Sequence, residues 1–433
     1  MHGRKMPATL RFMLASRRSE LLGLEDLTRT CELVTRISQL VHALQKERGY
    51  SNIYLGGNAA HQRQQLDALS LEAEALERAV RQDLDRIDLE AVSAADKTRL
   101  FTRIAYALHS LDELPALRRR IREHAISMQD ATATLVRLIG GLLAVVFEAA
   151  DTASDPHITR CLVALFNFMQ GKELAGQERA LGVVGFASGY FRADMLERLE
   201  HLLEGQERCF DTFSRFASPA AQALWQALCA SDTNFNACRL RDIARRTSPG
   251  AAVEAQLGEL WFELHTGRID AMKHVETRLE QDLLQQCRQS IERIRKDLQS
   301  HRKLLDGIAD MHAAAEQAKL FSVQASDLDT PPPDGMTAMV ARSTLELLLT
   351  QSVRLQGLNE ELREARQALD ERKQVERAKQ QLMRQQGCSE GEAYGRLRQA
   401  AMNQGLRLEE VAQRLLALDG SANTAARGQR CRH

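Results

Sequence analysis

The sequence predicts an all-α protein, and three observations support this fold class. Aromatic residues make up 5% of the 433 residues and proline occurs only 8 times, while Leu, Ala, Glu, Gln and Arg dominate the composition. Runs of β-branched and aromatic residues at period two are absent from the sequence. Most segments between predicted breaks are longer than a typical globular helix, which suits up-and-down bundles. We therefore expect two packed bundles of the four-helix type, a long coiled-coil-like helix and a small three-helix C-terminal module.

The first predicted domain covers residues 25–311. The preceding residues 1–24 are basic and irregular, and we expect a loosely held tail there. Residues 25–311 form long amphipathic segments, with breaks expected where Gly, Ser or Pro interrupt the pattern. These breaks are near Gly56-Gly57, Ser93, Pro115, Asp155-Pro156, Ser218-Pro219 and Ser248-Pro249-Gly250.

The most apolar segment runs from Leu135 to Ala150. It contains Arg137 and Glu148 and is shorter than the roughly 20 residues that a membrane helix needs. We predict a buried bundle helix and no membrane partner. No signal peptide is evident, so we expect reduced cysteines and a cytoplasmic protein.

A proline-rich linker is predicted at residues 324–336, because three consecutive prolines, Pro331 to Pro333, cannot continue a helix. A second long helix should run from residue 337 to about 386. Its part at 337–370 carries a heptad seam, which pairs with a second protomer or with its own chain. The seam residues are Leu348, Leu355, Leu358, Leu362, Ala365 and Leu369.

The C-terminal module is predicted at residues 371–420, followed by a disordered tail at 421–433. The long helix should end at Gly387, and Ser389 with Glu392 has the spacing of a capping box that starts the next helix. From Glu371 to the end there are 12 Lys and Arg against 7 Asp and Glu, a balance of +5. A basic end on an otherwise acidic chain favours a nucleic-acid-facing module, and a solvated helical surface remains the alternative.

This module resembles the ANTAR domain, the RNA-binding module of transcription antiterminators. The matching elements run from Ala378-Lys379 to Leu408-Glu409-Glu410-Val411-Ala412 and include Leu382-Met383, Glu392-Ala393-Tyr394, Leu397-Arg398 and Ala401-Met402. The resemblance implies binding to an RNA hairpin.

RNA hairpins are recognised through phosphates and unstacked loop bases. We therefore predict RNA contacts by Lys379, Arg396, Arg398 and Arg407. Tyr394, the last aromatic residue of the chain, either stacks on a base or packs in the core of the module.

Two motifs in the large domain place Glu-Arg beside small residues on a helix, at Gln45–Asn52 and Lys172–Ala180. A third element, Trp261–Ile269, sets Arg268 beside an aromatic face. A buried arginine must be paired. Its partner is either a neighbouring carboxylate, Glu47 or Glu178, or a bound oxyanion such as nitrate, which matches the planar guanidinium.

The same three motifs resemble the NIT domain, a helical nitrate- and nitrite-sensing module. A NIT domain followed by an ANTAR domain is typical of nitrate-responsive antiterminators. The resemblance implies a sensor of two packed helical bundles in which paired arginines bind nitrate. Motif by motif, these roles fall on Arg48 and Arg268, and Arg179 is expected to hold the site together.

Other site classes have little support in the sequence. The eight cysteines form no C-x-x-C pair and have no histidine cluster beside them, so we predict no metal site. There is no Gly-rich phosphate loop and no nucleophile elbow, so we predict no catalytic residues, no cofactor and no enzyme.

The favoured function is a nitrate- or nitrite-responsive antitermination regulator that binds a leader-RNA hairpin when ligand occupies the sensor. RNA polymerase would be met only indirectly, and a homodimer is considered. The alternatives are a sensor of another small anion with the same RNA output, and a non-sensing helical scaffold.

Overall fold

The computed structural model describes residues 8–57, 60–86, 98–322, 335–388 and 390–417. The regular elements in these ranges are α-helices, which confirms the predicted fold class. Their bounds are α1 (Ala8–Gly56), α2 (Ala60–Asp85), α3 (Thr98–Asp112), α4 (Leu114–Arg122), α5 (Met128–Thr152), α6 (Pro156–Ala187), α7 (Ala193–Phe216), α8 (Pro219–Cys229), α9 (Asp232–Arg246), α10 (Leu257–Ser322), α11 (Gly335–Gln386) and α12 (Glu390–Gln404). Residues 408–417 form one more helical segment.

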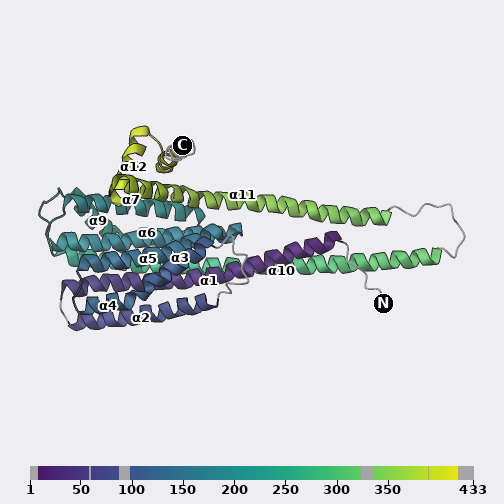
Figure 1. The fold of residues 1–433 in the computed structure, drawn as a ribbon, viewed down its shortest axis with the longest axis horizontal. Helices are drawn as coiled ribbons and strands as arrows, with labels where there is room; N and C mark the ends of the chain where they lie inside the picture. The colour runs from purple at the N-terminus through teal and green to yellow at the C-terminus, as the bar shows by residue number, and fades with distance from the viewer. Residues whose placement is uncertain (1–7, 58–59, 87–97, 323–334, 389, 418–433) are drawn as a thin grey trace, which may run out of the picture.

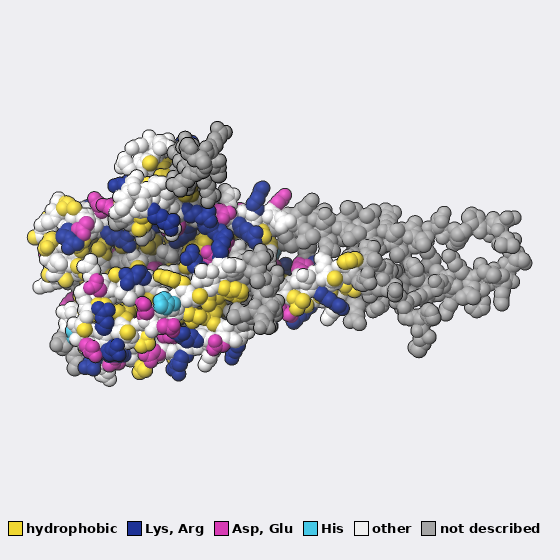
Figure 2. All heavy atoms as spheres, in the orientation of Figure 1, with side chains coloured by type: hydrophobic (Ala, Val, Ile, Leu, Met, Phe, Trp, Pro, Cys, Tyr) yellow, Lys and Arg dark blue, Asp and Glu magenta, His cyan; other side chains and the backbone are white. Residues whose placement is uncertain are grey.

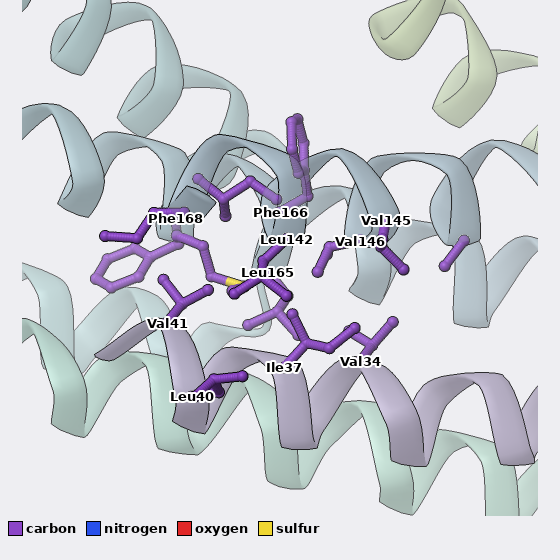
Figure 3. Packing of buried hydrophobic residues seen from close by; sticks show 14 of the residues in the cluster. Val34, Ile37, Leu40, Val41, Leu142, Val145, Val146, Leu165, Phe166 and Phe168 are labelled. Atoms are coloured by element: carbon purple, nitrogen blue, oxygen red, sulfur yellow. The ribbon is translucent and has the colours of Figure 1, made fainter. Parts of the chain in front are cut away.

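Three long helices, α1, α6 and α10, organise the large domain. Most of the other helices pack beside them along the same direction, while α3 crosses obliquely (Figure 1). The main core lies where α1, α5 and α6 meet (Figure 3). There Ile37 and Val41 of α1, Leu142 of α5, and Leu165 and Phe168 of α6 are 2% exposed or less. Burial of such side chains stabilises the fold by about 1.5–3 kcal/mol each, so this junction holds the helices that carry the site.

Several predicted breaks coincide with helix caps. Asp155 accepts a hydrogen bond from the backbone N–H of Ile158 at 2.9 Å, and Ser218 accepts one from that of Ala221 at 3.2 Å. In both helices proline follows the cap at the first helical position, where it has no backbone N–H to lose. Pro115 lies inside the first turn of α4, so the break falls before it, at Glu113. Ser93 lies outside the described residues.

The prediction of a loose tail at residues 1–24 is wrong for residues 8–24, because α1 begins at Ala8. Leu24 is 5% exposed, and Arg17 is 8% exposed and bonds Glu20 at 2.7 Å. Leucines at helical spacing continue the buried face of α1 backwards, and the many arginines hid this pattern. Residues 1–7 lie outside the described part of the chain.

Helix α5 is longer than the apolar run predicted from the sequence. It begins after Ser127, whose side chain caps the helix by accepting from Asp130 N–H. Among the described residues it is the one helix long and apolar enough to cross a membrane by length and composition, so the prediction that this segment is too short was wrong. Most of its 18-residue apolar window is buried inside the protein, which confirms the predicted bundle helix.

A second hydrophobic cluster joins α6, α7, α9 and α10 around Trp261, which is fully buried. Its indole N–H donates to the backbone oxygen of Arg179 at 3.0 Å, and its ring lies over the bare backbone of Gly182. A Cβ atom at Gly182 would overlap the indole ring.

We therefore expect Gly182→Ala to lower the free energy of unfolding by about 1–3 kcal/mol, the usual cost of overpacking a core. Urea denaturation monitored by tryptophan fluorescence would measure it. Gly140→Ala is the matched control, because open space surrounds that glycine. Equal stability of the two variants would contradict the predicted overlap.

Helix α11 is one uninterrupted helix from Gly335 to Gln386 and joins the C-terminal module to the sensor. The C-terminal half of α11 lies along α6 (Figure 1), where Ala365 and Leu369 are buried against the large domain of the same chain. The C-terminal end of the heptad seam, at Ala365 and Leu369, thus packs against its own chain and not against a second protomer. The side chains of Leu348, Leu355 and Leu358 and the linker residues 324–334 lie outside the described residues; Gly335 and Met336 are already helical.

The C-terminal module has its own small core of residues from α11, α12 and the helical segment 408–417, including Ala378, Leu382 and Leu397. Gly387 and Gly405 end the first two helices with φ of 61° and 62°, the left-handed conformation that glycine adopts without strain. Ser389 lies outside the described residues, so its predicted cap stays a prediction.

Candidate functional site

The two Glu-Arg motifs lie on different helices and meet face to face. The motif at Gln45–Asn52 is on α1 and the motif at Lys172–Ala180 is on α6. A Cβ atom at Gly176 would lie 2.5 Å from Arg48 Nη2, and one at Gly49 would overlap the guanidinium of Arg179. Each arginine therefore lies over a glycine of the other motif, and the glycines allow the two charged groups to reach the same interior space.

Arg48 is 1% exposed and makes a bidentate ion pair with Glu173 of α6. Its Nη1 and Nη2 atoms lie 2.5 and 3.1 Å from the two carboxylate oxygens. Gln45 donates to the same carboxylate at 2.9 Å, and Gln177 at 3.0 Å. The carboxylate therefore accepts four hydrogen bonds, which hold it in a fixed orientation.

Arg179 is 4% exposed, and its contacts are neutral. It donates to the hydroxyl of Thr266 at 2.9 Å and to the backbone oxygen of Gln45 at 3.2 Å, and it lies 5.1 Å from the ring centre of Phe262. No carboxylate of the described residues lies within 4.0 Å of it. Burial and the neighbouring charge of Arg48 lower the pKa of Arg179 to about 10, which still leaves it protonated at neutral pH.

The charges of this site do not cancel. Two guanidinium groups, those of Arg48 and Arg179, face one carboxylate, that of Glu173, so the buried group carries a net charge of +1. An isolated buried charge is costly, and one bound monovalent anion would neutralise it. We call Arg48, Arg179, Glu173 and Gln45 the arginine site.

Arg268 of α10 lies in a neighbouring cluster built around Glu178 of α6. Its Nε donates to Asn234 at 3.0 Å, its Nη1 donates to Gln206 at 3.2 Å, and its Nη1 lies 3.6 Å from Glu178. Arg241 makes the closer bidentate pair with Glu178, at 2.7 and 2.9 Å. Burial and the charge of Arg241 lower the pKa of Arg268 to about 10.

The structure thus brings Arg48 and Arg179 together and places Arg268 beside them, across α6. Glu178 neutralises Arg241 and lies near Arg268, in keeping with the carboxylate alternative. For Arg48 the expected carboxylate partner, Glu47, was wrong, because Arg48 pairs with Glu173. Glu47 pairs with Arg118 at 2.7 Å, because adjacent helical residues point about 100° apart, and Glu47 faces α4 while Arg48 faces α6.

Sequence reasoning missed Glu173, Gln45, Thr266 and Phe262 as parts of the site. All four lie inside or at the edge of the three motifs, so motif membership was an available signal. Their mutual contacts span more than 80 residues of sequence, and no local pattern specifies them.

A second buried charge network lies next to the arginine site. Lys172 and Glu276 are both fully buried and pair at 2.5 Å, and Lys273 bonds Glu276 and Glu280 at 2.8 Å each. Burial and the charge of Lys172 lower the pKa of His42 to about 3. His42 is therefore neutral in the folded protein well above pH 3.

The low pKa of His42 predicts acid sensitivity. Between its unfolded pKa of 6.5 and its folded pKa of about 3, the unfolded chain binds one more proton, so stability is lost as pH falls through this window. We expect the free energy of unfolding to decrease by about 1.4 kcal/mol per pH unit below pH 6.5 from this group alone. Urea titrations at pH 6.5, 6 and 5 should show a smaller slope in His42→Gln. An unchanged slope would show that His42 titrates normally.

The C-terminal module is docked on the sensor domain. In Figure 1 α12 rises from the end of α11, at the place where α11 lies over α7, and side chains of α12 and α7 are in contact. Tyr394 stacks edge-on against His201 with ring centres 4.3 Å apart, Arg208 lies 4.9 Å from the Tyr394 ring centre, and Arg398 pairs with Glu204 at 2.7 Å.

This docking covers part of the predicted RNA-binding set. Tyr394 is 5% exposed and Lys379 is 6% exposed, and Lys379 pairs with Glu376 at 2.8 Å. Tyr394 is buried, as expected if it packs in the core of the module. Part of what buries it is α7 of the sensor domain. Arg396 and Arg407 are exposed, and Arg398 is held by Glu204. The surface that would meet RNA is therefore divided between free and covered residues.

Comparison with known proteins agrees with the predicted sensor and RNA-binding domains. A family model described as "Nitrate and nitrite sensing" (NIT) matches residues 39–284, which contain the three motifs and the arginine site. The chain belongs to the NIT family. In this NIT protein the ANTAR domain model matches residues 363–416, so the match begins inside α11, earlier than the predicted boundary at residue 371.

Two known proteins are similar to this NIT protein over nearly its whole length. The "Nitrate regulatory protein" of Klebsiella oxytoca is 34% identical over 420 residues, which are 95% of this chain and 96% of the relative. The solved "Structure of the NasR transcription antiterminator" superposes with a TM-score of 0.58 at 32% identity and covers 96% of this chain and 100% of that one. The similarity thus extends over nearly the full length of this chain and of both relatives.

Proposed function

We infer that this NIT protein is a nitrate- and nitrite-responsive regulator of transcription antitermination. The observation that carries the inference is a buried arginine site with one uncompensated positive charge, on the same chain as an ANTAR module in which the docked sensor covers Tyr394 and holds Arg398. Full-length similarity to the nitrate regulatory protein and to the NasR antiterminator supports it.

The ligand proposed for the arginine site is nitrate or nitrite. These ions are small, monovalent and planar or bent, and guanidinium groups bind such oxyanions through paired N–H donors. Arg48 and Arg179 supply the donors, and Gly49 and Gly176 allow both guanidinium groups to reach the same interior space. Arg268 supports the site from the neighbouring cluster by holding Gln206 and Asn234 in place.

The route from ligand to output runs through α6. An anion that pairs with Arg179 competes with Glu173 for Arg48 and favours a different arrangement of α1 and α6. Helix α7 and α11 both pack on α6, and α7 holds Tyr394 and Arg398 of the module. A ligand that binds the rearranged bundle better shifts the population toward a released module, which then binds a leader-RNA hairpin and prevents the terminator from forming.

The remaining parts of the proposal concern partners. The regulator acts in the cytoplasm on nascent RNA and meets RNA polymerase only indirectly. We also propose a homodimer that pairs through residues 337–362. Light scattering of the purified protein, with and without nitrate, tests this.

Calorimetric titration with nitrate is the decisive test of the sensor. We expect saturable binding of nitrate, with chloride and acetate as controls that do not compete. At a nitrate concentration 100 times the Kd, the free energy of unfolding should rise by about 2.7 kcal/mol. If millimolar nitrate produces no binding heat and no stabilisation, the sensor half of the proposal is wrong. The RNA-binding half would still stand.

A further inference from the structure

A basic cleft lies between the sensor domain and α11, on the side of α11 away from the docked module's contact with α7. It encloses about 450 Å³ and is lined by residues of α3, α5, α6 and α11. Its charged lining consists of five cations and two anions. The cations are Arg99, Arg103, Arg372, Lys373 and Arg377, and the anions are Glu148 and Glu376.

The sensor contributes two exposed cations to this cleft. The side chains of Arg99 and Arg103 on α3 are 58% and 53% exposed. Both lie more than 3.5 Å from the nearest oxygen of Glu148, and Arg99 lies 3.3 Å from Asp151. Glu148 and Asp151 are only 5% and 13% exposed, but the guanidinium groups themselves face solvent and are not held by close bidentate pairs, so they can also contact another anion.

The opposite wall belongs to the ANTAR match. Arg372 lies 4.7 Å from the ring centre of Phe166, and Lys373 lies 5.8 Å from that of Phe147 and bonds Asp151. Arg377 is exposed one turn further along α11. Figure 2 shows the dark-blue side chains gathered in a band where α11 meets the body of the sensor. This band joins the basic residues of α11 to those of the sensor domain.

We propose that this cleft is a second RNA contact, in which Arg99 and Arg103 of the sensor bind phosphates of the RNA held by the ANTAR module. A row of cations that follows an open groove beside a nucleic-acid-binding helix suits a phosphate backbone, whose binding is driven by release of counterions. The inference rests on the proposed function, because the RNA must first bind the module.

The test uses the full chain in saturating nitrate and a hairpin RNA selected from a random-loop library for binding to it. In Arg99→Gln/Arg103→Gln we expect binding to weaken roughly tenfold at low salt. The slope of log K against log salt should decrease by roughly 1.4–1.8, since each phosphate contact contributes about 0.7–0.9. Arg99→Lys/Arg103→Lys keeps the charges and should retain most of the slope.

The matched control is Arg63→Gln/Arg78→Gln, which removes the same charge from exposed positions of α2, on the far side of the bundle (Figure 1). Nitrate titration of each variant shows whether the sensor is intact. Wild-type RNA affinity and slope in Arg99→Gln/Arg103→Gln, or an equal loss in the α2 control, would overturn the second contact alone. Failure to select any hairpin would overturn it together with the RNA-binding half of the proposed function.

Discussion

Replacing Arg48 with alanine is expected to lower the free energy of unfolding by about 3–5 kcal/mol and to abolish nitrate binding. The first effect follows because Glu173, 2% exposed, would keep a buried charge without its bidentate partner. The second follows because Arg48 supplies half of the guanidinium donors of the arginine site. Urea denaturation and calorimetric titration measure the two effects separately.

Two further variants separate stability from ligand binding at this site. Arg48→Met/Glu173→Met removes both charges, and we expect it to recover most of the lost stability without recovering nitrate binding. Arg179→Met removes the arginine that has no carboxylate partner, so it should leave stability nearly unchanged while nitrate binding is lost. Wild-type nitrate affinity in Arg48→Ala would exclude the site, and wild-type stability would show that the Arg48–Glu173 pair does not form.

Glu204→Lys is expected to raise RNA affinity in the absence of nitrate by about 5–150-fold, the usual range of coupling between two sites. The substitution replaces the 2.7 Å pair with Arg398 by repulsion and places a cation beside Arg208, which already packs on Tyr394. The docked module is thereby destabilised, and its RNA-facing residues become accessible. Fluorescence anisotropy with a selected hairpin RNA, with and without nitrate, measures the change.

The control for this variant is Glu207→Lys, which makes the same charge change at an exposed position one turn along α7. It corrects for non-specific attraction of RNA to an added lysine. If both variants gain affinity equally, the contact between α7 and α12 does not restrain the module. If neither gains and nitrate still stimulates binding, the signal reaches the module by another route than release from α7.

Much of the architecture could be read from residue patterns. Helical spacing, low aromatic content and the positions of Asp155-Pro156 and Ser218-Pro219 predicted a helical protein with correct breaks, because caps and prolines act on their own helix. The ANTAR and NIT motifs predicted the family and hence the function class. The error at residues 8–24 arose because charged residues on the exposed face of α1 concealed leucines on its buried face.

The sequence predicted the arginines of the arginine site but not their partners. Its motifs identify Arg48, Arg179 and Arg268 and place small residues beside them, which local helix geometry suffices to indicate. Which carboxylate each arginine meets depends on how α1, α6 and α10 cross, and residues 125 positions apart come together there. Only the tertiary structure decided that Arg48 meets Glu173, that Arg179 meets no described carboxylate, and that Tyr394 is covered by α7. Helix formation depends on neighbouring residues, whereas these pairings depend on the packing of whole helices, which no single segment of sequence encodes.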